Sequence, residues 1–426
     1  MKIKNFKELA ISTKRTDALS IIHAGLVAVD TRVAIQKSVE CDGKTLRIAD
    51  TVYTLSAYDR VRVVAVGKCS VEAVYALEEL LGDVLTDGIA LDVVQGVSKT
   101  GTVTFLTGTH PLPTQMNVDA TKCILDFLDS STERDLVIMS ISGGGSTLAS
   151  QPLNGLSVDE ESRAIAALMN AGAPIQDMNT IRKHLSRARG GGLAQCAYPA
   201  TVASLIFSDV PGDDISYIAS GPTVCDTTTI SDAQALLVSY GLEAIGPYLI
   251  ETPKGTELFE KVTNTIIVSN SIALEAMKKE SIVRGYTAEI VTSTLTGEAR
   301  SVAHDIVERI HSAPEKTVLL FGGETTVTSE GPHGIGGRNQ EVALAGLRTI
   351  ADGEVLIACA SDGRDNTDVA GAVCDTITMH AAQEKGLSVE ECLASHSSFL
   401  FFEKSASHIV TGATGSNVSD LIIALK

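Results

Sequence analysis

Residues 136–147 read Leu136-Val137-Ile138-Met139-Ser140-Ile141-Ser142-Gly143-Gly144-Gly145-Ser146-Thr147, an apolar run that passes directly into a turn rich in glycine and hydroxyl groups. A run of this length is typical of a buried strand, and the glycines after it predict a turn into a helix. Similar runs, each followed by a polar or glycine-rich turn and a helix-like stretch, occur at residues 61–66, 202–207, 265–268, 317–321 and 355–360. This alternation predicts βαβ units and therefore an α/β fold.

The composition agrees with that fold class. The chain has 426 residues, 44% of them hydrophobic and 4% aromatic, and its apolar positions are mostly Ala, Val, Leu and Ile, which parallel strands covered by helices use. The length corresponds to about two to three typical domains. The best linker candidate is Glu251-Thr252-Pro253-Lys254-Gly255-Thr256, so we expect a boundary near residue 258 and domains at 1–258 and 259–426.

The charge balance limits the classes of partner. Lysine and arginine total 34 against 52 aspartate and glutamate, a formal net charge of -18. Such a surface repels nucleic acid and anionic membranes, so we expect neither as a partner, and the cations for an anionic ligand must be local. The eight cysteines include no C-x-x-C pair, and no apolar run reaches the length of about 18 residues needed to span a membrane. We expect a cytoplasmic protein in a reducing compartment.

Residues of the types that commonly bind ligands follow each of the six predicted strands. In open α/β sheets, ligands bind outside the carboxyl ends of the strands. Turns contain Gly, Ser and Asp in any case, but their presence after all six strands favours a site. These strand ends are Gly67-Lys68, residues 142–147, residues 208–214, Ser269-Asn270-Ser271, Gly322-Gly323-Glu324-Thr325 and residues 361–366.

A glycine turn with an arginine occurs at Gly334-Ile335-Gly336-Gly337-Arg338-Asn339-Gln340-Glu341. Backbone N–H groups can approach a ligand closely at such a turn, and an arginine directly after it can neutralise a transferring phosphoryl group. The alternative is a helix entered through a glycine turn with Arg338 in solvent.

The turn at residues 142–147 offers consecutive backbone N–H groups and two hydroxyls, which suit phosphate or carboxylate oxygens. The alternative is a tight turn whose glycines let a helix pack closely on the sheet. Neither a P-loop nor G-x-G-x-x-G is present, because Arg62 stands where a P-loop ending at Lys68 needs its first glycine. A Walker ATPase and a typical Rossmann dehydrogenase are therefore disfavoured.

Charged residues at these strand ends have two interpretations each. Lys68 either meets an anion or extends into solvent. Asp209 and Asp362 each follow a buried strand and suit Mg²⁺ or acceptance of a hydroxyl proton, and the alternative for each is an Asx turn or a helix N-cap.

The most basic segment of the chain covers residues 179–189. Helical spacing predicts Arg182, Ser186 and Arg189 on one face, either as an anion-attracting surface or as a solvated one. His110 lies in a proline-braced turn and is expected to be structural.

Taken together, a series of motifs resembles the type-2 glycerate kinases, which have an N-terminal domain followed by a MOFRL domain. The motifs cover nearly the whole chain: Gly67-Lys68, His110-Pro111, residues 142–146, residues 179–186, residues 208–213, Ser220-Gly221-Pro222-Thr223, residues 336–341, Ser361-Asp362-Gly363 and residues 411–418. The resemblance implies two α/β domains, the larger N-terminal one with a Rossmann-like parallel sheet, and an active site in the inter-domain cleft. It also implies transfer of the γ-phosphoryl group of ATP to D-glycerate, usually giving 2-phosphoglycerate, with Mg²⁺.

The resemblance further implies roles for individual residues. Lys68 and Arg338 resemble a pair of catalytic cations, one from each domain. We add the hypothesis that Asp209 takes the hydroxyl proton and that Asp362 holds Mg²⁺, with the two roles open to exchange. The residues that resemble nucleotide-binding positions are Ser142, Gly143, Gly144, Gly145, Ser146, Ser220, Gly221, Glu324 and Asn417.

Departures from the family pattern concern Ile335 in the glycine turn and Cys69-Ser70 after Lys68. They bear on substrate fit or rate, since Lys68 and Arg338 are both retained. The alternative activity is an NAD(P)H-dependent hydroxypyruvate reductase, and a non-catalytic metabolite-binding protein is a third class. The sequence leaves open the hydroxyl that is phosphorylated, the enantiomer, a longer sugar acid as substrate, the nucleotide base and a homo-oligomeric state.

Overall fold

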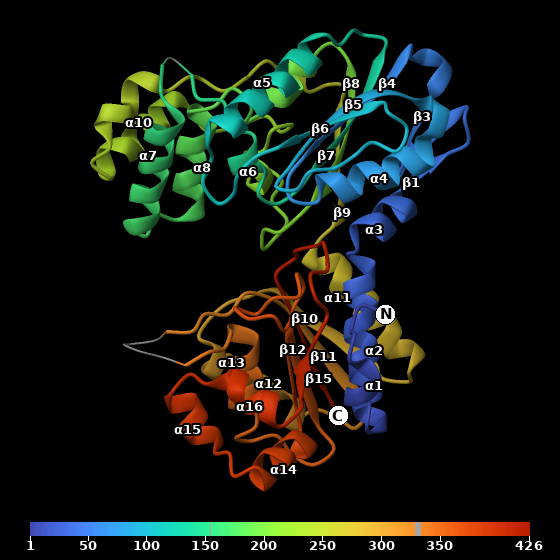
Figure 1. The fold of residues 1–426 in the computed structure, drawn as a ribbon, viewed down its shortest axis with the longest axis vertical. Helices are drawn as coiled ribbons and strands as arrows, with labels where there is room; N and C mark the ends of the chain where they lie inside the picture. The colour runs from blue at the N-terminus through green and yellow to red at the C-terminus, as the bar shows by residue number, and fades with distance from the viewer. Residues whose placement is uncertain (154, 329–333) are drawn as a thin grey trace. The chain divides into compact units, whose positions relative to one another are not determined.

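The computed structural model describes residues 1–153, 155–328 and 334–426. The chain forms two compact units (Figure 1). The terminal unit consists of Met1–Asp30 and Val268–Lys426, and the middle unit consists of Thr31–Ile267. The middle unit is therefore an insertion into the terminal unit.

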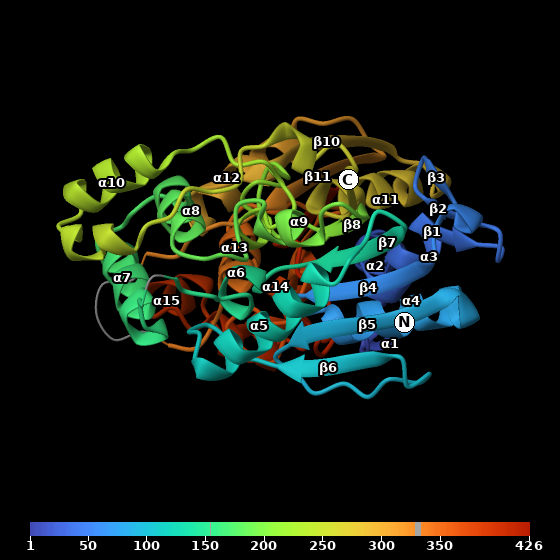
Figure 2. The same ribbon diagram turned by 90° about the horizontal axis from the view of Figure 1, so that it is seen from above.

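The middle unit is built on a six-stranded sheet with the order β6-β5-β4-β7-β8-β9. Figure 2 shows the strands β6, β5, β4, β7 and β8 of this sheet side by side. The strands β4 to β8 pair in parallel, and Val66 at the end of β4 lies opposite both Leu91 and Ile141. The carboxyl ends of the central strands therefore reach the same edge at the same level. The strands are β4 (Arg60–Val66), β5 (Leu85–Asp92), β6 (Val103–Thr107), β7 (Asp135–Ile141), β8 (Thr201–Phe207) and β9 (Val262–Val268).

Apolar packing holds the helices of this unit to the sheet. Val64, Met139 and Ile206 from the strands share one buried cluster with Ile124 and Leu193 from the helices. A second buried cluster joins α7, α8 and α10, which lie together at one side of the unit (Figure 1). The helices are α3 (Thr31–Ser38), α4 (Ser70–Leu81), α5 (Gln115–Asp129), α6 (Gly145–Leu148), α7 (Val158–Asn170), α8 (Ile175–His184), α9 (Gly192–Ala197) and α10 (Ile230–Ser239), and a small antiparallel sheet contains β1 (Val39–Cys41), β2 (Thr45–Ile48) and β3 (Thr51–Thr54).

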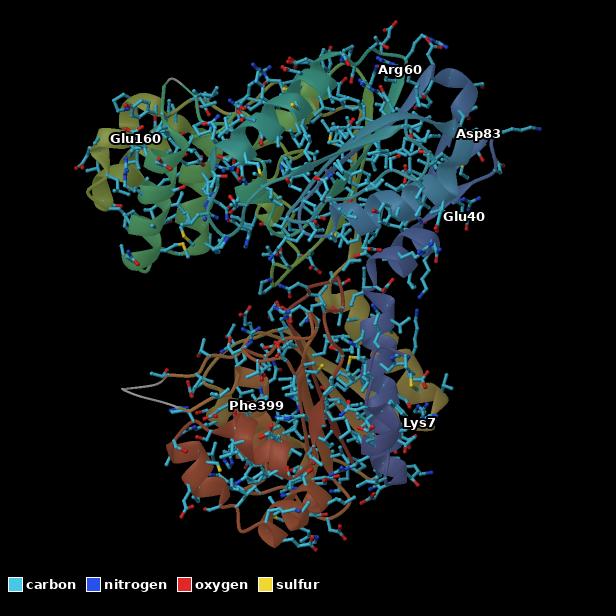
Figure 3. All side chains as sticks on the ribbon, viewed as in Figure 1. Lys7, Glu40, Arg60, Asp83, Glu160 and Phe399 are labelled. Carbon is cyan, nitrogen blue, oxygen red and sulfur yellow. The ribbon has the colours of Figure 1, made fainter. Side chains whose placement is uncertain are left out.

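Charged side chains at the amino-terminal end of this sheet are paired with each other. Arg60, labelled in Figure 3, donates to Asp135 at 2.6 Å, and Arg62 donates to Asp87 at 2.8 Å. Arg62 also lies over the ring of Phe127, with its Cζ 3.7 Å from the ring centroid. These cations are structural and stand at the opposite end of β4 from Lys68.

The terminal unit contains a mixed six-stranded sheet with the order β10-β11-β15-β12-β13-β14. β15 runs antiparallel to both β11 and β12, so β11 and β12 point the same way and β15 starts where they end. Asp420, the first residue of β15, lies opposite Gly323 on one side and Ala360 on the other. The strands are β10 (Thr287–Leu295), β11 (Thr317–Gly323), β12 (Val355–Ala360), β13 (Gly371–Cys374), β14 (His408–Ile409) and β15 (Asp420–Leu425).

The first thirty residues belong to this unit because of specific packing. Gly25 of α2 approaches α11 so closely that a Cβ there would lie 2.8 Å from Cγ of Met277. Arg15 donates from Nη2 to Asp375 at 2.5 Å, and both side chains are buried. The helices of the unit are α1 (Phe6–Leu9), α2 (Thr13–Ala28), α11 (Asn270–Val283), α12 (Ala299–His311), α13 (Arg338–Gly346), α14 (Thr376–Glu384), α15 (Val389–Ala394) and α16 (Ser398–Lys404).

The predicted fold class is confirmed, since all six predicted apolar runs are strands and the middle unit has the expected parallel sheet. The two packing units differ from the expected domains. Residues 1–30 pack with the C-terminal part, and the chain passes from the middle unit back into the terminal unit between Ile267 and Val268. The family boundary near residue 258 stays a prediction. Within the residues described, no single helix is long and apolar enough to cross a membrane, although α2 and α3, separated by a bend, meet the same criterion as a pair.

Candidate functional site

Three turns meet at the carboxyl edge of the parallel sheet in the middle unit. They follow β4, β7 and β8, and their glycines allow close contact. At Gly67, with φ of +130°, a Cβ would lie 2.0 Å from Oγ of Ser142. A Cβ at Gly143 would lie 2.2 Å from Oδ2 of Asp209. The glycines are therefore required for packing, and that packing brings the Asp209 carboxylate beside the turn after β7.

The turn after β7 has unused backbone donors. The N–H groups of Gly143, Gly144 and Ser146 have no hydrogen-bond acceptor among the described residues, whereas the N–H of Gly145 donates to the carbonyl of Ser142 at 3.2 Å. Gly144 adopts φ of +82°, the left-handed conformation that glycine favours. Neighbouring N–H groups around a left-handed residue form a concave binding site for anions.

Lys68 lies along the same turn. Its backbone N–H donates to the carbonyl of Gly143 at 3.0 Å, and a Cβ at Gly144 would lie 3.0 Å from the Cγ and Cε atoms of Lys68. The exposed ammonium has no ion pair or hydrogen bond within residues 1–153, 155–328 and 334–426. One cation and three unused amides are therefore available at one place.

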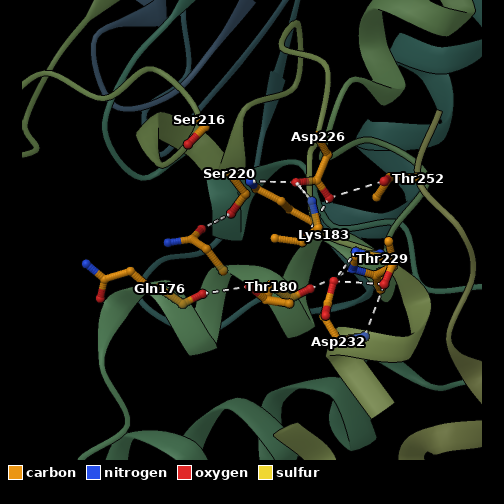
Figure 4. Close-up of polar contacts among 12 residues, drawn as sticks. Gln176, Thr180, Lys183, Ser216, Ser220, Asp226, Thr229, Asp232 and Thr252 are labelled. Carbon is orange, nitrogen blue, oxygen red and sulfur yellow. Dashed lines mark hydrogen bonds and ion pairs between the residues drawn. The ribbon is translucent and has the colours of Figure 1, made fainter. Parts of the chain in front are cut away.

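A chain of hydroxyl and amide groups supports this turn from behind. The Oγ atoms of Ser146 and Ser220 lie 2.8 Å apart. Ser220, labelled in Figure 4, donates to Oδ1 of Asn179 at 2.7 Å. Ser220 and Asn179 are buried. Ala219, Ser220 and Gly221 all adopt positive φ, at +50°, +61° and +60°. Ser220 and Gly221 thus lie in a conformationally unusual segment whose hydroxyl supports Ser146.

The predicted helical face of Arg182, Ser186 and Arg189 is wrong, because α8 ends at His184. Ser186 instead forms an isolated bridge with Pro152 and accepts a hydrogen bond at Oγ from the N–H of Gln151 at 3.2 Å. The pairing of this segment with residues 151–152 replaces the helix. The alternative of a solvated surface is wrong for Lys183 and Arg189 as well, since both are buried.

Most cations of this segment have carboxylate partners. Lys183 donates to Asp226 at 3.1 Å (Figure 4), and Arg189 pairs with Glu161. Arg189 also donates from Nε to the carbonyl of Ser146 at 2.9 Å and from Nη1 to the carbonyl of Arg182 at 3.2 Å. These bonds fasten the end of α8 to the turn after β7.

Arg182 and His110 are two further titratable residues near this edge of the sheet, and both have lowered pKa values. Burial and the charge of Arg189 lower the pKa of Arg182 to about 10, so it stays protonated at neutral pH. Partial desolvation lowers the pKa of His110, and the charges of Lys68 and Arg182 lower it further. Both cations therefore act on the same imidazole.

In the terminal unit, Arg338 is held by two carboxylates. Its Nε and Nη2 atoms donate to Asp420 at 2.6 and 3.0 Å, and Nη1 donates to Glu324 at 2.6 Å. Asp420 is buried, whereas the side chain of Glu324 is 51% exposed. Burial raises the pKa of Asp420 to about 6, although Arg338 and Asn339 act in the opposite direction. The carboxylate partners outweigh the burial of Arg338 and raise its pKa.

The start of α13 is capped by Asp365 from the turn after β12. The N–H groups of Asn339 and Gln340 donate to this buried carboxylate at 3.0 and 2.8 Å. A Cβ at Gly337 would lie 2.1 Å from the carbonyl oxygen of Asp365. The glycine turn therefore serves the cap, and two of the first N–H groups of the helix are already occupied. Arg338 is ion-paired, so the alternative of an arginine in solvent is wrong, and its action on a phosphoryl group stays a prediction.

The other predicted residues of this unit stand at the same sheet edge. Asp362 accepts from the N–H of Arg364 at 2.9 Å, and Asn417 accepts from the N–H of Ser419 at 3.1 Å, as in Asx turns. In the described part of the chain, no group of three or more His, Cys, Asp or Glu side chains is arranged to hold a metal ion. Mg²⁺ often takes only one or two carboxylates with phosphate and water, so the assignment of Asp362 stays a prediction.

A cavity of about 350 Å³ lies beside Arg338 within the terminal unit. Glu324, Thr325, Gly336, Arg338 and His396 are among its lining residues. The Glu324 side of the guanidinium therefore borders an open space, while the Asp420 side is closed.

Sequence reasoning missed Asp420, which precedes an apolar run and reads as the ordinary start of a strand. It also treated Arg182 as one member of a basic segment. The signal for Asp420 is its place before the last apolar run, Leu421-Ile422-Ile423-Ala424-Leu425, but only the antiparallel direction of β15 brings it to the ligand edge.

Comparison with known proteins identifies the family. One family model, described as a domain of unknown function (DUF4147), matches residues 17–251, and a second, the MOFRL family, matches residues 317–420. A glycerate 2-kinase from Pyrococcus horikoshii is 35% identical to this chain, over 96% of it and 97% of the relative. The chain belongs to the type-2 glycerate kinase family. The resemblance inferred from its motifs is confirmed.

Other members of the type-2 glycerate kinase family extend this result. A D-glycerate 2-kinase from Thermotoga maritima is 35% identical over 92% of this chain and 96% of the relative. The crystal structure of a glycerate kinase from Thermotoga maritima has a TM-score of 0.85 at 31% identity, covering 96% of this chain and 98% of that one. A relative from Agrobacterium vitis, 36% identical over 85% of this chain and 86% of its own length, carries the name putative hydroxypyruvate reductase.

Proposed function

We propose that this protein is a glycerate 2-kinase that transfers the γ-phosphoryl group of ATP to D-glycerate and releases ADP and 2-phosphoglycerate. The observation that carries the proposal is the unpartnered Lys68 ammonium beside the unused N–H groups of Gly143, Gly144 and Ser146, among the residues that the structure describes. Phosphoryl transfer requires positioning and charge neutralisation more than covalent chemistry. Such a group of donors suits phosphoryl oxygens.

Arg338 supplies the second cation in this proposal. Asp420 holds two of its nitrogens from the buried side, so the Nη1 edge toward Glu324 is the part that a ligand oxygen can reach. We propose that an incoming phosphoryl oxygen replaces Glu324 at Nη1. Lys68 and Arg338, which belong to different units, then act on the same phosphoryl group.

The acceptor hydroxyl must lose its proton during transfer. The hydroxyl oxygen forms a bond to the γ-phosphorus, the bond from that phosphorus to the ADP oxygen breaks, and the proton passes to a base. We propose Asp209 as that base, since its carboxylate borders the turn at Gly143. Asp362, with an Oδ2 atom that is not used in its Asx turn, would hold Mg²⁺. When bound, Mg²⁺ would neutralise phosphate oxygens of ATP.

The reductase alternative has weaker support. It rests on the name of some relatives, and the chain has no G-x-G-x-x-G motif for a dinucleotide. The scattered cysteines fit a reducing compartment, so we propose a cytoplasmic enzyme.

A two-channel assay tests the proposal. Purified protein is incubated with MgATP and D-glycerate while ADP release is followed, and in parallel with hydroxypyruvate while NADH oxidation is followed. We expect ADP release only, with the product identified as 2-phosphoglycerate by ³¹P–¹H NMR coupling. Activity only in the NADH channel overturns the kinase, and 3-phosphoglycerate as the product overturns the proposed position of transfer.

A further inference from the structure

Arg182 differs from every other cation in its segment. Lys183 pairs with Asp226, Arg187 with Asp129 at 3.3 Å, and Arg189 with Glu161. The Arg182 guanidinium, which is half-buried, has no ion pair and no side-chain hydrogen bond among the described residues. A guanidinium has five donor N–H bonds and cannot lose its charge at physiological pH.

This arrangement is costly without an anion. A charge that is partly removed from water needs a partner, and an Arg that stays protonated cannot escape by neutralisation. Glu161 is paired with Arg189, and the charge of Arg189 outweighs the favourable effect that the charge of Glu161 has on Arg182. One uncompensated positive charge therefore remains at the end of α8.

The structure also shows where Arg182 stands on α8. Arg182 stands one helical turn after Asn179 on α8, and residues three apart share a helix face. Asn179 faces Ser220, which in turn contacts Ser146. Arg189 binds the carbonyls of both Arg182 and Ser146. The main chain of Arg182 is thus held beside the turn after β7.

Arg182 and Lys68 are both close enough to His110 for their charges to lower its pKa. The two cations nevertheless differ in chemistry. Lys68 is a compact ammonium next to unused backbone N–H groups, a combination that suits phosphate oxygens. Arg182 is a planar fork, which binds a carboxylate through two parallel hydrogen bonds.

We propose that Arg182 binds the carboxylate of the acceptor substrate and thereby selects a hydroxy acid over an uncharged polyol or amide. The proposal rests on the proposed kinase function for the identity of the acid. The single positive charge of Arg182 matches the single negative charge of glycerate. When the carboxylate is bound at Arg182, the hydroxyl groups of the acid can face the Lys68 ammonium and the neighbouring backbone N–H groups that bind the phosphoryl group.

Kinetics with two acceptors test the selection. D-glycerate and its uncharged amide, D-glyceramide, are compared as acceptors for the wild type, Arg182→Gln and Arg182→Lys. We expect Arg182→Gln to raise KM for D-glycerate by roughly 10- to 100-fold, the value of a hydrogen-bonded charge, with a much smaller change in kcat. Turnover of D-glyceramide should change less than about threefold. Arg182→Lys should fall between the two, because it keeps the charge and loses the fork.

Arg187→Gln is the matched control. It removes an arginine from the same segment, but that arginine is exposed and paired with Asp129. It should leave both acceptors unchanged. Equal KM values for D-glycerate in wild type and Arg182→Gln would overturn the proposal, as would an equal loss with the two acceptors.

A binding experiment separates this proposal from the kinase itself. Calorimetric titration of the full chain with D-glycerate, without nucleotide, should show binding to the wild type and at least about tenfold weaker binding to Arg182→Gln. Thermal unfolding of the free variant checks its fold, and we expect no loss of Tm because the described residues give the Arg182 guanidinium no partner to lose. Arg182-dependent binding of D-glycerate without turnover would overturn the kinase function alone, whereas turnover without such binding would overturn this inference alone.

Discussion

Arg338 and Asp420 form a two-point ion pair at the edge of the terminal sheet, with Nε 2.6 Å from Oδ2 and Nη2 3.0 Å from Oδ1. The register of β15 places Asp420 between the ends of β11 and β12, so its carboxylate is buried where the arginine leaves the glycine turn. A guanidinium held on one edge has a defined second edge. Asp420 therefore orients Arg338 while leaving Nη1 to an exchangeable partner.

Replacing Arg338 by Ala should lower kcat on the order of 10³-fold or more, comparable to removal of an arginine finger. The reason is the loss of a cation that acts on the charge developing in the transition state. Steady-state ADP release with saturating MgATP and D-glycerate measures the effect. A loss below about tenfold would rule out the proposed role.

Replacing Asp420 by Asn should lower kcat/KM by roughly 10- to 100-fold, because one charged hydrogen-bond pair that orients Arg338 is weakened. Asp352→Asn is a suitable control, since Asp352 is an exposed aspartate of the same unit that contacts Thr376. Activity of Asp420→Asn equal to that of the control would mean that Arg338 is positioned without this carboxylate.

The activity should decline in acid with an apparent pKa near 6, because burial raises the pKa of Asp420 to about 6 and the protonated group no longer pairs with Arg338 as an anion. The stability contribution has the opposite sign. The folded pKa lies above the ordinary value of 3.8, so the folded state binds the proton more tightly, and the cost of the buried charge above pH 6 is relieved as the pH falls. A pH–rate profile of Asp420→Asn should lack this acid limb, and retention of the limb would assign it to another group.

Replacing Gly144 by Ala should reduce stability by about 1 kcal/mol and also reduce activity, because its φ is +82° and the new Cβ would meet the Lys68 side chain at 3.0 Å. Gly101→Ala is the matched control. Gly101 has φ of +79°, and a Cβ there would have no atom within 4 Å. Denaturant titrations should give similar losses for both variants, while only Gly144→Ala should raise KM for ATP. A similar kinetic defect in both would contradict the placement of Lys68.

The parts of the fold that depend on local pattern were predictable from the sequence. The apolar runs at β4, β7, β8, β9, β11 and β12 stand out, and the parallel direction of the first three brings Lys68, Gly143 and Asp209 to one edge. The grouping of these residues was predictable because neighbouring parallel strands end at the same edge of a sheet.

The missing parts depend on residues that are distant in sequence. Asp420 reaches the ligand edge only because β15 is antiparallel to its neighbours. Arg182 stands out only once Lys183 and Arg189 are seen to pair with Asp226 and Glu161. The end of α8 at His184 depends on a bridge between Ser186 and Pro152. None of these partners leaves a local signal.

The insertion of the middle unit between Asp30 and Val268 has a consequence for biosynthesis. Residues 31–267 emerge from the ribosome as one continuous stretch and hold all that their own sheet needs except the last residue of β9. The terminal sheet must wait for Asp420–Leu425, because β15 is an interior strand between β11 and β12. Until then α2, which lies in the first thirty residues, lacks part of the surface against which it packs, because β15 has not yet been made. Nascent chains stalled before residue 420 should therefore carry a folded middle unit and an open terminal one, whose exposed apolar helix is a natural ligand for chaperones.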